Sequence, residues 1–390
     1  MSEWKEVRLG DVILHSCSGG TPKSNVSEYY DGEIPWLNTK EIDFNRIYQT
    51  ERNITQKGLD NSSAKWIDEK CVIIAMYGAT AGKIAINMIP LTTNQACCNL
   101  KVDDRLADFR YIYYFLKKDF KFLASLANGG AQQNLNSQII KDYVIKLPSL
   151  SIQKEISDLL WTIDAKIETN NKLNEKLEEM AQAIFKSWFV DFEPFKDKPF
   201  HETELGMIPE GWEVVSLTDI ATFTNGLAMQ KFRPNYKEPH LPVLKIKELR
   251  QGFCDDSSEI CIDDISDDFI ADDGDIIFSW SGTLLVDIWC GGKCGVNQHL
   301  FKVTSEKYNK WFFYFWIKRH LAEFIRIAKD KAVTMGHIKR GHLTNALVVV
   351  PNEKTMQNAD KIFTPIIDRI IEAKIESKRL ASLRDTLLPR

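Results

Sequence analysis

Two long stretches of the chain carry apolar residues at intervals of three and four, one after Pro148 and one after Pro351. This spacing places the apolar side chains on one stripe of an amphipathic helix. The first stretch predicts a helix over residues 151–188, which would be about 57 Å long at 1.5 Å per residue. The second stretch predicts a similar helix within residues 352–390.

The apolar stripes of these two helices superpose when the sequence is shifted by 203 residues. Both weaken midway, at Asn170 and Asn174 in the first and at Ala373 and Ser377 in the second, and a polar seam residue fixes register at some cost in stability. Neither helix can bury its stripe alone, so we expect an antiparallel pair; the alternative is that each helix packs on its own globular domain. The seam residues are expected to be Ile163, Ile167, Leu177, Ile184, Ile366, Ile370, Leu380 and Leu387.

Short β-rich runs, separated by Gly, Pro and Asn, precede each long helix. They predict strands, whereas two aromatic segments at 109–123 and 309–326 predict helices. We expect those aromatic side chains in the core rather than on a surface that stacks on bases. The fold class is therefore α+β, with mixed α/β domains and long helices. The predicted strands are 72–76, 84–88, 144–147, 276–280 and 347–350.

The chain repeats itself, with an offset that drifts between about 200 and 208 residues. Residues 4–12 and 212–220 share four identical positions out of nine, which is well above chance. Because six such blocks occur in the same order, coincidence is a poor explanation. The matched blocks are 4–12 with 212–220, 35–42 with 242–249, 73–80 with 276–283, 94–95 with 297–298, 111–116 with 311–316, and 143–148 with 346–351.

The repeat and the helices divide the chain into five parts. Residues 1–148 form a first mixed α/β domain, 149–190 a central helix, and 191–210 a linker rich in Pro and charge. Residues 211–351 form the second mixed domain, and 352–390 the distal helix.

The net charge of −4 argues against a chain that grips nucleic acid alone, because such proteins normally present a basic surface. The charge is unevenly spread. Residues 149–210 hold seven basic and thirteen acidic side chains, and residues 255–275 hold ten acids and no base. Residues 310–340, in contrast, hold eight bases and two acids. A basic face can therefore exist, with partners supplying part of the binding to phosphate.

Scattered cysteines and the absence of a signal peptide or long apolar run predict a cytoplasmic location and no membrane.

A series of short motifs runs along the whole chain, beginning with GGTPK (19–23), IPW (34–36), YGATAGK (77–83), TNQACC (93–98) and GGAQQNLN (129–136). It continues with FKSWFVDFEPF (185–195) and LGMIPEGWEV (205–214). In order and duplication, this series resembles the specificity subunit of Type I restriction–modification enzymes. The second copy lacks GGTPK, and MGHIK (335–339) replaces QQNLN. Such divergence is expected when two domains read different half-sites, but it makes the transfer of residue roles into the second copy unsafe.

The resemblance implies two target-recognition domains, each reading one half of a split double-stranded DNA site. The long helices would form a coiled-coil spacer that docks two methyltransferase (modification) subunits, and motor-nuclease (restriction) subunits would complete the complex. The chain itself would be non-catalytic and hold no cofactor. S-adenosylmethionine would be bound by the partner methyltransferase, and ATP and magnesium by the partner nuclease.

Side chains suited to reading base edges lie beside Gly-rich segments in both copies. Arg and Lys pair with guanine, and Asn and Gln with adenine. The recurring pairs at 94–95 and 297–298 have a structural alternative, namely buried amides that tie a loop together. Residues that differ between the copies are better specificity candidates. The candidate DNA-binding residues are Lys23, Lys40, Lys83, Gln132, Gln133, Asn134, Lys245, Lys247, His337, Lys339 and Arg340.

Catalytic and metal-binding motifs are not found in the sequence. No Pro-Pro occurs, so the tetrapeptide with which adenine methyltransferases hold a flipped base is missing. The YGATAGK segment has the wrong glycine spacing for a phosphate loop. Cys290 and Cys294 with His299 have no second cysteine pair at zinc-finger spacing, so a structural turn is expected. The acidic stretch lacks EF-hand spacing and predicts a solvated loop.

Two rival hypotheses remain open at this point. One is a tandem module on a coiled-coil scaffold that binds a ligand other than DNA, and the other is a self-sufficient nuclease or methylase.

Overall fold

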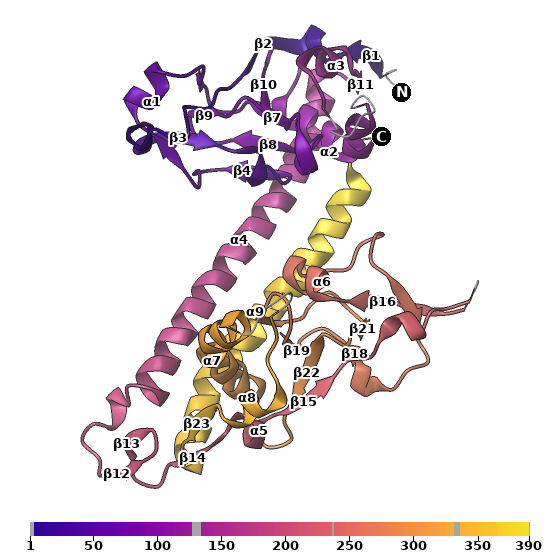
Figure 1. Cartoon of the computed structure of the whole chain (residues 1–390). Coiled ribbons are helices and arrows are strands. Elements are labelled where there is room, and N and C mark those ends of the chain that lie inside the picture. Colours follow the sequence, from indigo (N-terminus) through magenta and orange to yellow (C-terminus); the bar gives the residue numbers. More distant parts are fainter. Residues whose placement is uncertain (1–3, 127–133, 236–237, 331–335, 390) are drawn as a thin grey trace. The chain divides into compact units, whose positions relative to one another are not determined.

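The computed structural model describes residues 4–126, 134–235, 238–330 and 336–389. It divides into two compact units (Figure 1). Unit 1 comprises residues 1–165 and 380–390, and unit 2 comprises residues 166–379. No helix in the described part of the chain is long and apolar enough to cross a bilayer.

Unit 1 contains three small sheets and a helical layer. The largest sheet has the order β2-β10-β7-β8-β4, and the second has the order β5-β3-β9-β6. A two-stranded sheet joins β1 (Lys5–Arg8) to β11 (Val144–Leu147). The helices are α1 (Gln56–Asp60), α2 (Phe109–Ser125) and α3 (Ser137–Asp142). The other strands are β2 (Ile13–Ser18), β3 (Tyr30–Leu37), β4 (Asn45–Ile47), β5 (Asn53–Ile54), β6 (Trp66–Ile67), β7 (Val72–Ala75), β8 (Ile84–Asn87), β9 (Leu91–Thr93) and β10 (Cys97–Val102).

Unit 2 contains three sheets whose strand orders correspond to those of unit 1. Its sheets have the orders β15-β22-β19-β20 and β17-β16-β21-β18, and β14 (Glu213–Ser216) pairs with β23 (Leu347–Val350). Among the described strands, β4 of unit 1 has no counterpart in unit 2, and the hairpin strands β12 (Phe200–Thr203) and β13 (Gly206–Pro209) of unit 2 have none in unit 1. The predicted internal repeat is thus confirmed at the level of topology. The remaining strands are β15 (Thr222–Asn225), β16 (His240–Leu244), β17 (Ile260–Ile262), β18 (Ile270–Ala271), β19 (Ile276–Ser279), β20 (Leu285–Ile288), β21 (Cys294–Val296) and β22 (Leu300–Thr304). The helices are α5 (Leu217–Ile220), α6 (Ile246–Gln251), α7 (Lys310–Asp330) and α8 (Arg340–Thr344).

Two of the aligned blocks are corrected by one residue. In the structure β7 starts at Val72 and β19 at Ile276, so these strands match with an offset of 204 rather than 203. Helices α2 and α7 start at Phe109 and Lys310, an offset of 201 rather than 200. Apolar residues of similar size are adjacent in both blocks, so sequence identity alone does not distinguish the two registers. In a strand the difference matters, because a slip of one residue turns every side chain to the other face.

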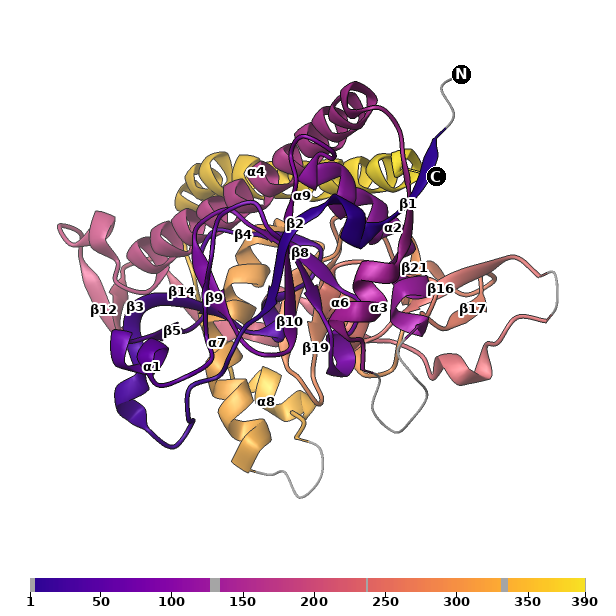
Figure 2. The same ribbon diagram turned by 90° about the horizontal axis from the view of Figure 1, so that it is seen from above.

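The two long helices are α4 (Leu150–Phe189) and α9 (Glu353–Leu387), close to their predicted bounds. Within unit 2 they run antiparallel, because Asn170 contacts Ala373 whereas Phe185, further along α4, contacts Phe363, earlier in α9. Figures 1 and 2 both show the two helices side by side. Within unit 1, Asp164 of α4 forms an ion pair with Arg384 of α9 at 2.7 Å. The predicted antiparallel pair is confirmed.

The predicted seam is close to the buried face but slightly out of phase. Ile163 and Ile370 are buried, and Ile167, Leu177, Ile184, Ile366 and Leu380 are half-buried. Leu387 is a correction, because it is 42% exposed and Leu388 is buried instead. The aromatic residues that fill the face of α4 in unit 2, Phe185 and Phe189, lie next to the predicted stripe rather than on it.

The middle of the helix pair, within unit 2, is polar, as the sequence suggested. Asn170 is 1% exposed, and its Nδ2 donates to Glu376 at 2.8 Å. Within the described part of the chain, three buried atoms of this layer have no hydrogen-bond partner: Asn170 Oδ1, Asn174 Oδ1 and Ser377 Oγ. Unpaired buried polar atoms are costly, so this layer contributes less stability than the apolar layers that flank it.

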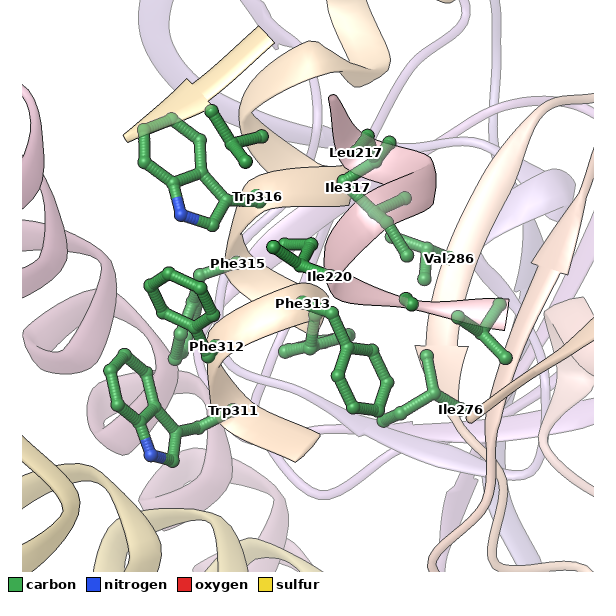
Figure 3. Close-up of a cluster of buried hydrophobic side chains, with 14 of the residues drawn as sticks. Leu217, Ile220, Ile276, Val286, Trp311, Phe312, Phe313, Phe315, Trp316 and Ile317 are labelled. Atoms are coloured by element: carbon green, nitrogen blue, oxygen red, sulfur yellow. The ribbon is translucent and has the colours of Figure 1, made fainter. Parts of the chain in front are cut away.

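The aromatic helices lie in the core, as expected. In unit 2 the residues of α7 from 311 to 317 are all buried, and they pack between the sheet and the long helices (Figure 3). Trp311 stacks on Phe363 with ring centroids 4.4 Å apart. The predicted linker also adds to this core. It forms a hairpin of β12 (Phe200–Thr203) and β13 (Gly206–Pro209), and Phe195 and Ile208 are buried.

Candidate nucleic-acid interface

Each unit brings a glycine turn next to the segment that precedes its short helix α3 or α8. In unit 1 an isolated antiparallel bridge joins Tyr77 to Asn134, and in unit 2 the corresponding bridge joins Ser281 to His337. The residue after the first partner is a glycine with positive φ in both units, Gly78 and Gly282. Glycine adopts this backbone conformation without the strain that a Cβ would bring. Two sequence-predicted candidates, Asn134 of unit 1 and His337 of unit 2, thus lie beside equivalent glycine turns.

The basic candidates of unit 2 follow directly after this bridge. His337, Lys339 and Arg340 are exposed, and Lys339 caps α8. Arg340 donates to the carbonyl of Phe223 at 3.3 Å, which ties its guanidinium to the neighbouring strand. Three predicted residues are therefore grouped here, with Arg340 partly committed to the fold.

The lysines at 40, 245 and 247 lie elsewhere, around a turn that both units share. In unit 1 the side chain of Glu41 accepts from the backbone N–H of Asn38 at 2.9 Å, and in unit 2 Glu248 accepts from that of Lys245 at 3.2 Å. Each lysine has an acidic partner: Lys40 pairs with Glu51, Lys245 with Glu259, and Lys247 with Asp255. Exposed ion pairs are weak, so these lysines can exchange partners, but their local charge is largely neutralised.

The remaining candidates of unit 1 are dispersed. Lys83 pairs with Asp43 at 2.7 Å and is 31% exposed. Lys23 is exposed in the segment between β2 and β3. Gln132 and Gln133 lie outside the described residues. Of the first-copy candidates, only Asn134 is placed by the structure directly at the glycine turn.

The recurring asparagines have the structural role that the sequence left open. Asn94 is buried, and its Oδ1 accepts from the backbone N–H of Ala96 at 3.1 Å. Asn297 is also buried, and its Oδ1 accepts from that of His299 at 3.3 Å. Both amides therefore tie the same loop together from inside the domain.

The acidic stretch of unit 2 is largely exposed and contributes no positive charge. Some of its acids pair with lysines from other strands, as Asp275 does with Lys302 at 3.3 Å. Exposed carboxylates would repel phosphate, so this stretch is a poor candidate for a contact with DNA. The basic edge near residues 337–340 is the better candidate.

Cys290 and Cys294, the two cysteines considered as metal ligands in the sequence, are both buried. Burial raises the pKa of the Cys290 thiol to about 11, and a hydrogen bond with Cys254 together with burial raises the pKa of Cys294. Neutral thiols are poor metal ligands. Among the described residues, no group of three or more His, Cys, Asp or Glu is arranged to hold a metal ion.

Comparison with known proteins places the duplicated architecture in a family. The model of the Type I restriction modification DNA specificity domain matches residues 1–179 and 209–382, which is one match for each copy. The chain belongs to this family. It is similar to the Type I restriction enzyme MjaIX specificity subunit of Methanocaldococcus jannaschii, with 31% identity over 403 residues, covering 100% of this chain and 92% of the relative.

Two further comparisons extend over the full length. The Type I restriction enzyme HindI specificity subunit of Haemophilus influenzae is 20% identical over 466 residues, covering 100% of this chain and 99% of the relative. The crystal structure of the Type I restriction–modification S subunit from M. genitalium has a TM-score of 0.58 and 16% identity, covering 99% of this chain and 95% of that one. The structural similarity supports the fold, and the family assigns the chain to the specificity subunits, which recognise DNA sequence.

One residue at the candidate edge was not among the sequence-predicted candidates. Tyr77 is 40% exposed and forms the bridge to Asn134. The signal was available, because Tyr77 precedes a glycine in the YGATAGK motif. An aromatic residue beside a strand is more often buried, so exposure could not be inferred from the sequence.

Proposed function

We propose that this specificity subunit reads a bipartite DNA site, with one half-site contacted by each unit. The observation that carries the proposal is the matched topology of the two mixed α/β domains, each of which is followed in the sequence by one of two long helices that run antiparallel within unit 2. One small domain discriminates only a few base pairs at about 1–3 kcal/mol each. Two readers on one chain combine these energies, and the linkage raises the effective concentration of the second contact.

The long helices α4 and α9 serve as the spacer in this proposal and dock two methyltransferase subunits. Apolar side chains remain exposed on them, including Leu159 and Leu383 of unit 1 and Met180 of unit 2. Motor-nuclease subunits complete the restriction complex. The chain directs these enzymes and performs no chemistry itself. S-adenosylmethionine is held by the methyltransferase, and ATP and magnesium by the nuclease.

The test is co-expression with a methyltransferase partner in a host that lacks adenine methylation, followed by single-molecule sequencing for methyladenine. The expected result is a motif of two short defined halves with a fixed undefined gap. Replacing residues 1–148 by the same region of a relative should change only one half. No methylation, or methylation at one continuous short site, would contradict the proposal and favour a tandem module for another ligand.

A further inference from the structure

Asn134 in unit 1 and His337 in unit 2 occupy the same backbone position. Each forms an isolated bridge to the residue before a positive-φ glycine. The next residue anchors the segment in the same way in both units. The N–H of Leu135 donates to the carbonyl of Met76 at 2.8 Å, and the N–H of Ile338 donates to that of Trp280 at 3.0 Å.

The direction of the two side chains follows from this anchoring. Leu135 is 1% exposed and Ile338 is 2% exposed, so both point into the core. Successive side chains of an extended segment point to opposite faces. Asn134 and His337 must therefore project outward, and both are exposed.

The framework is the same in both units, but the projecting side chain differs. The glycine turn, the bridge and the buried anchor recur, whereas an amide stands at this position in unit 1 and an imidazole in unit 2. In unit 2 the imidazole lies edge-on to Trp280, with ring centroids 6.3 Å apart, and Lys339 is two residues away. A fixed backbone with a variable side chain is what two readers of different sequences require.

We infer that Asn134 and His337 are matched specificity-determining residues, each contacting one base pair of its own half-site. This inference rests on the proposed function. The amide of an asparagine can donate from Nδ2 to N7 of adenine and accept at Oδ1 from the N6 amino group, which assigns an A·T pair to Asn134. An imidazole N–H can donate to O6 or N7 of guanine, which assigns a G·C pair to His337. Lys339 supplies positive charge for the nearby phosphates.

The experiment uses the full chain assembled with its methyltransferase partner, and a set of duplexes that each carry one base change in the wild-type motif. Methylation rates are compared for the wild type, Asn134→Ala and His337→Ala. Asn61→Ala and His240→Ala are matched controls, because both residues are exposed and belong to other elements, Asn61 at the end of α1 and His240 in β16. Thermal unfolding of each variant checks that the fold is retained.

We expect Asn134→Ala to reduce discrimination at one A·T pair of one half-site by roughly ten- to a hundredfold, with the other positions unchanged. We expect the same loss for His337→Ala at one G·C pair of the other half-site, and no change in the controls. The inference is overturned if both variants discriminate like the wild type, or if each slows methylation equally on all duplexes. If the wild type itself yields no split motif, the proposed function fails before this inference is reached.

Discussion

Helices α2 and α7 hold equivalent places in the two units but pack by different chemistry. In unit 1 the buried face of α2 is rich in tyrosine, and the hydroxyls of Tyr111 and Tyr114 donate to Lys146 O and to Asp164, each at 2.7 Å. In unit 2 the buried face of α7 is dominated by tryptophan and phenylalanine, as Figure 3 shows. These rings contact one another and the aromatic residues of α4 and α9.

The difference shows that one topology can be stabilised in two ways. The contacts of α2 include directional hydrogen bonds, and Asp164 of α4, which accepts from Tyr114, also forms an ion pair with Arg384 of α9. The side chains of this ion pair are largely buried, with Asp164 10% and Arg384 14% exposed. The contacts of α7 are mostly between large apolar rings, although Trp311 also donates to Asp360 and Tyr314 to Glu178. Directional contacts are sensitive to loss of one partner and to pH, whereas ring packing is sensitive to loss of volume.

The largest effect is expected from a cavity in the aromatic cluster. Phe189→Ala removes a fully buried ring that contacts Trp212, Trp311, Phe312 and Phe363. The free energy of unfolding of unit 2 should fall by about 3–5 kcal/mol. Urea unfolding followed by tryptophan fluorescence measures this, with the exposed Trp66→Ala as a control. A loss below about 1 kcal/mol would show that the cluster can collapse around the gap.

The next effect concerns the ion pair of unit 1. Asp164→Ala leaves Arg384 without its partner in α4 and Tyr114 without its acceptor, and should cost about 3 kcal/mol. Asp158→Ala is the matched control, because Asp158 is on the same helix, pairs with Arg110 and is 67% exposed. If the two variants lost the same free energy of unfolding, burial would not be the reason for the large effect of Asp164→Ala.

A smaller effect is expected from a single hydroxyl. Tyr114→Phe keeps the ring but removes the donor to Asp164, and should cost about 1–2 kcal/mol. Combined with Asp164→Ala in a double-mutant cycle, the two losses should be less than additive. Full additivity would mean that the hydroxyl and the carboxylate do not interact.

The smallest effect is a pH dependence in unit 1. Burial lowers the pKa of Lys117 from its ordinary 10.5 to about 8, and Arg384 adds to this. Between these two pKa values the unfolded chain binds more protons than the folded chain, so the free energy of unfolding rises with pH from about 8 to 10.5. Below pH 8 the free-energy cost of burying the charged ammonium group is fully present. Lys117→Met should therefore stabilise unit 1 by about 1 kcal/mol at pH 7, with the gain shrinking as pH rises. Urea unfolding at pH 7 and 9.5 tests this, and the exposed Lys65→Met should show no such trend.

Much of the fold was predictable because its signals are local. Strands β11 and β23 have their predicted bounds, and α4 differs from its prediction by one residue at each end. The polar middle of the helix pair was also visible as Asn170 and Ser377. Two aligned blocks were wrong by one residue, and Leu387 was wrongly expected in the seam. In each case several apolar residues are adjacent in the sequence, and tertiary packing decides which of them is buried.

The candidate site was less predictable. Residue type indicated which side chains suit base edges, but not which are brought together. Within unit 2, Lys245 is ion-paired with Glu259, whereas His337 forms the bridge at the glycine turn. Only long-range pairing places Tyr77 beside Asn134.

The pairing of β1 with β11, and of β14 with β23, has an evolutionary consequence. Lys5 lies opposite Leu147 in unit 1, and Glu213 lies opposite Val350 in unit 2. The first and last strands of each mixed α/β domain are therefore neighbours, so the chain enters and leaves the domain at the same place. Recombination at these two neighbouring points can replace a whole mixed α/β domain without changing the sequence of the long helices. Under the proposed function, such an exchange would change one half of the target sequence in a single step, without a series of mutations within one domain.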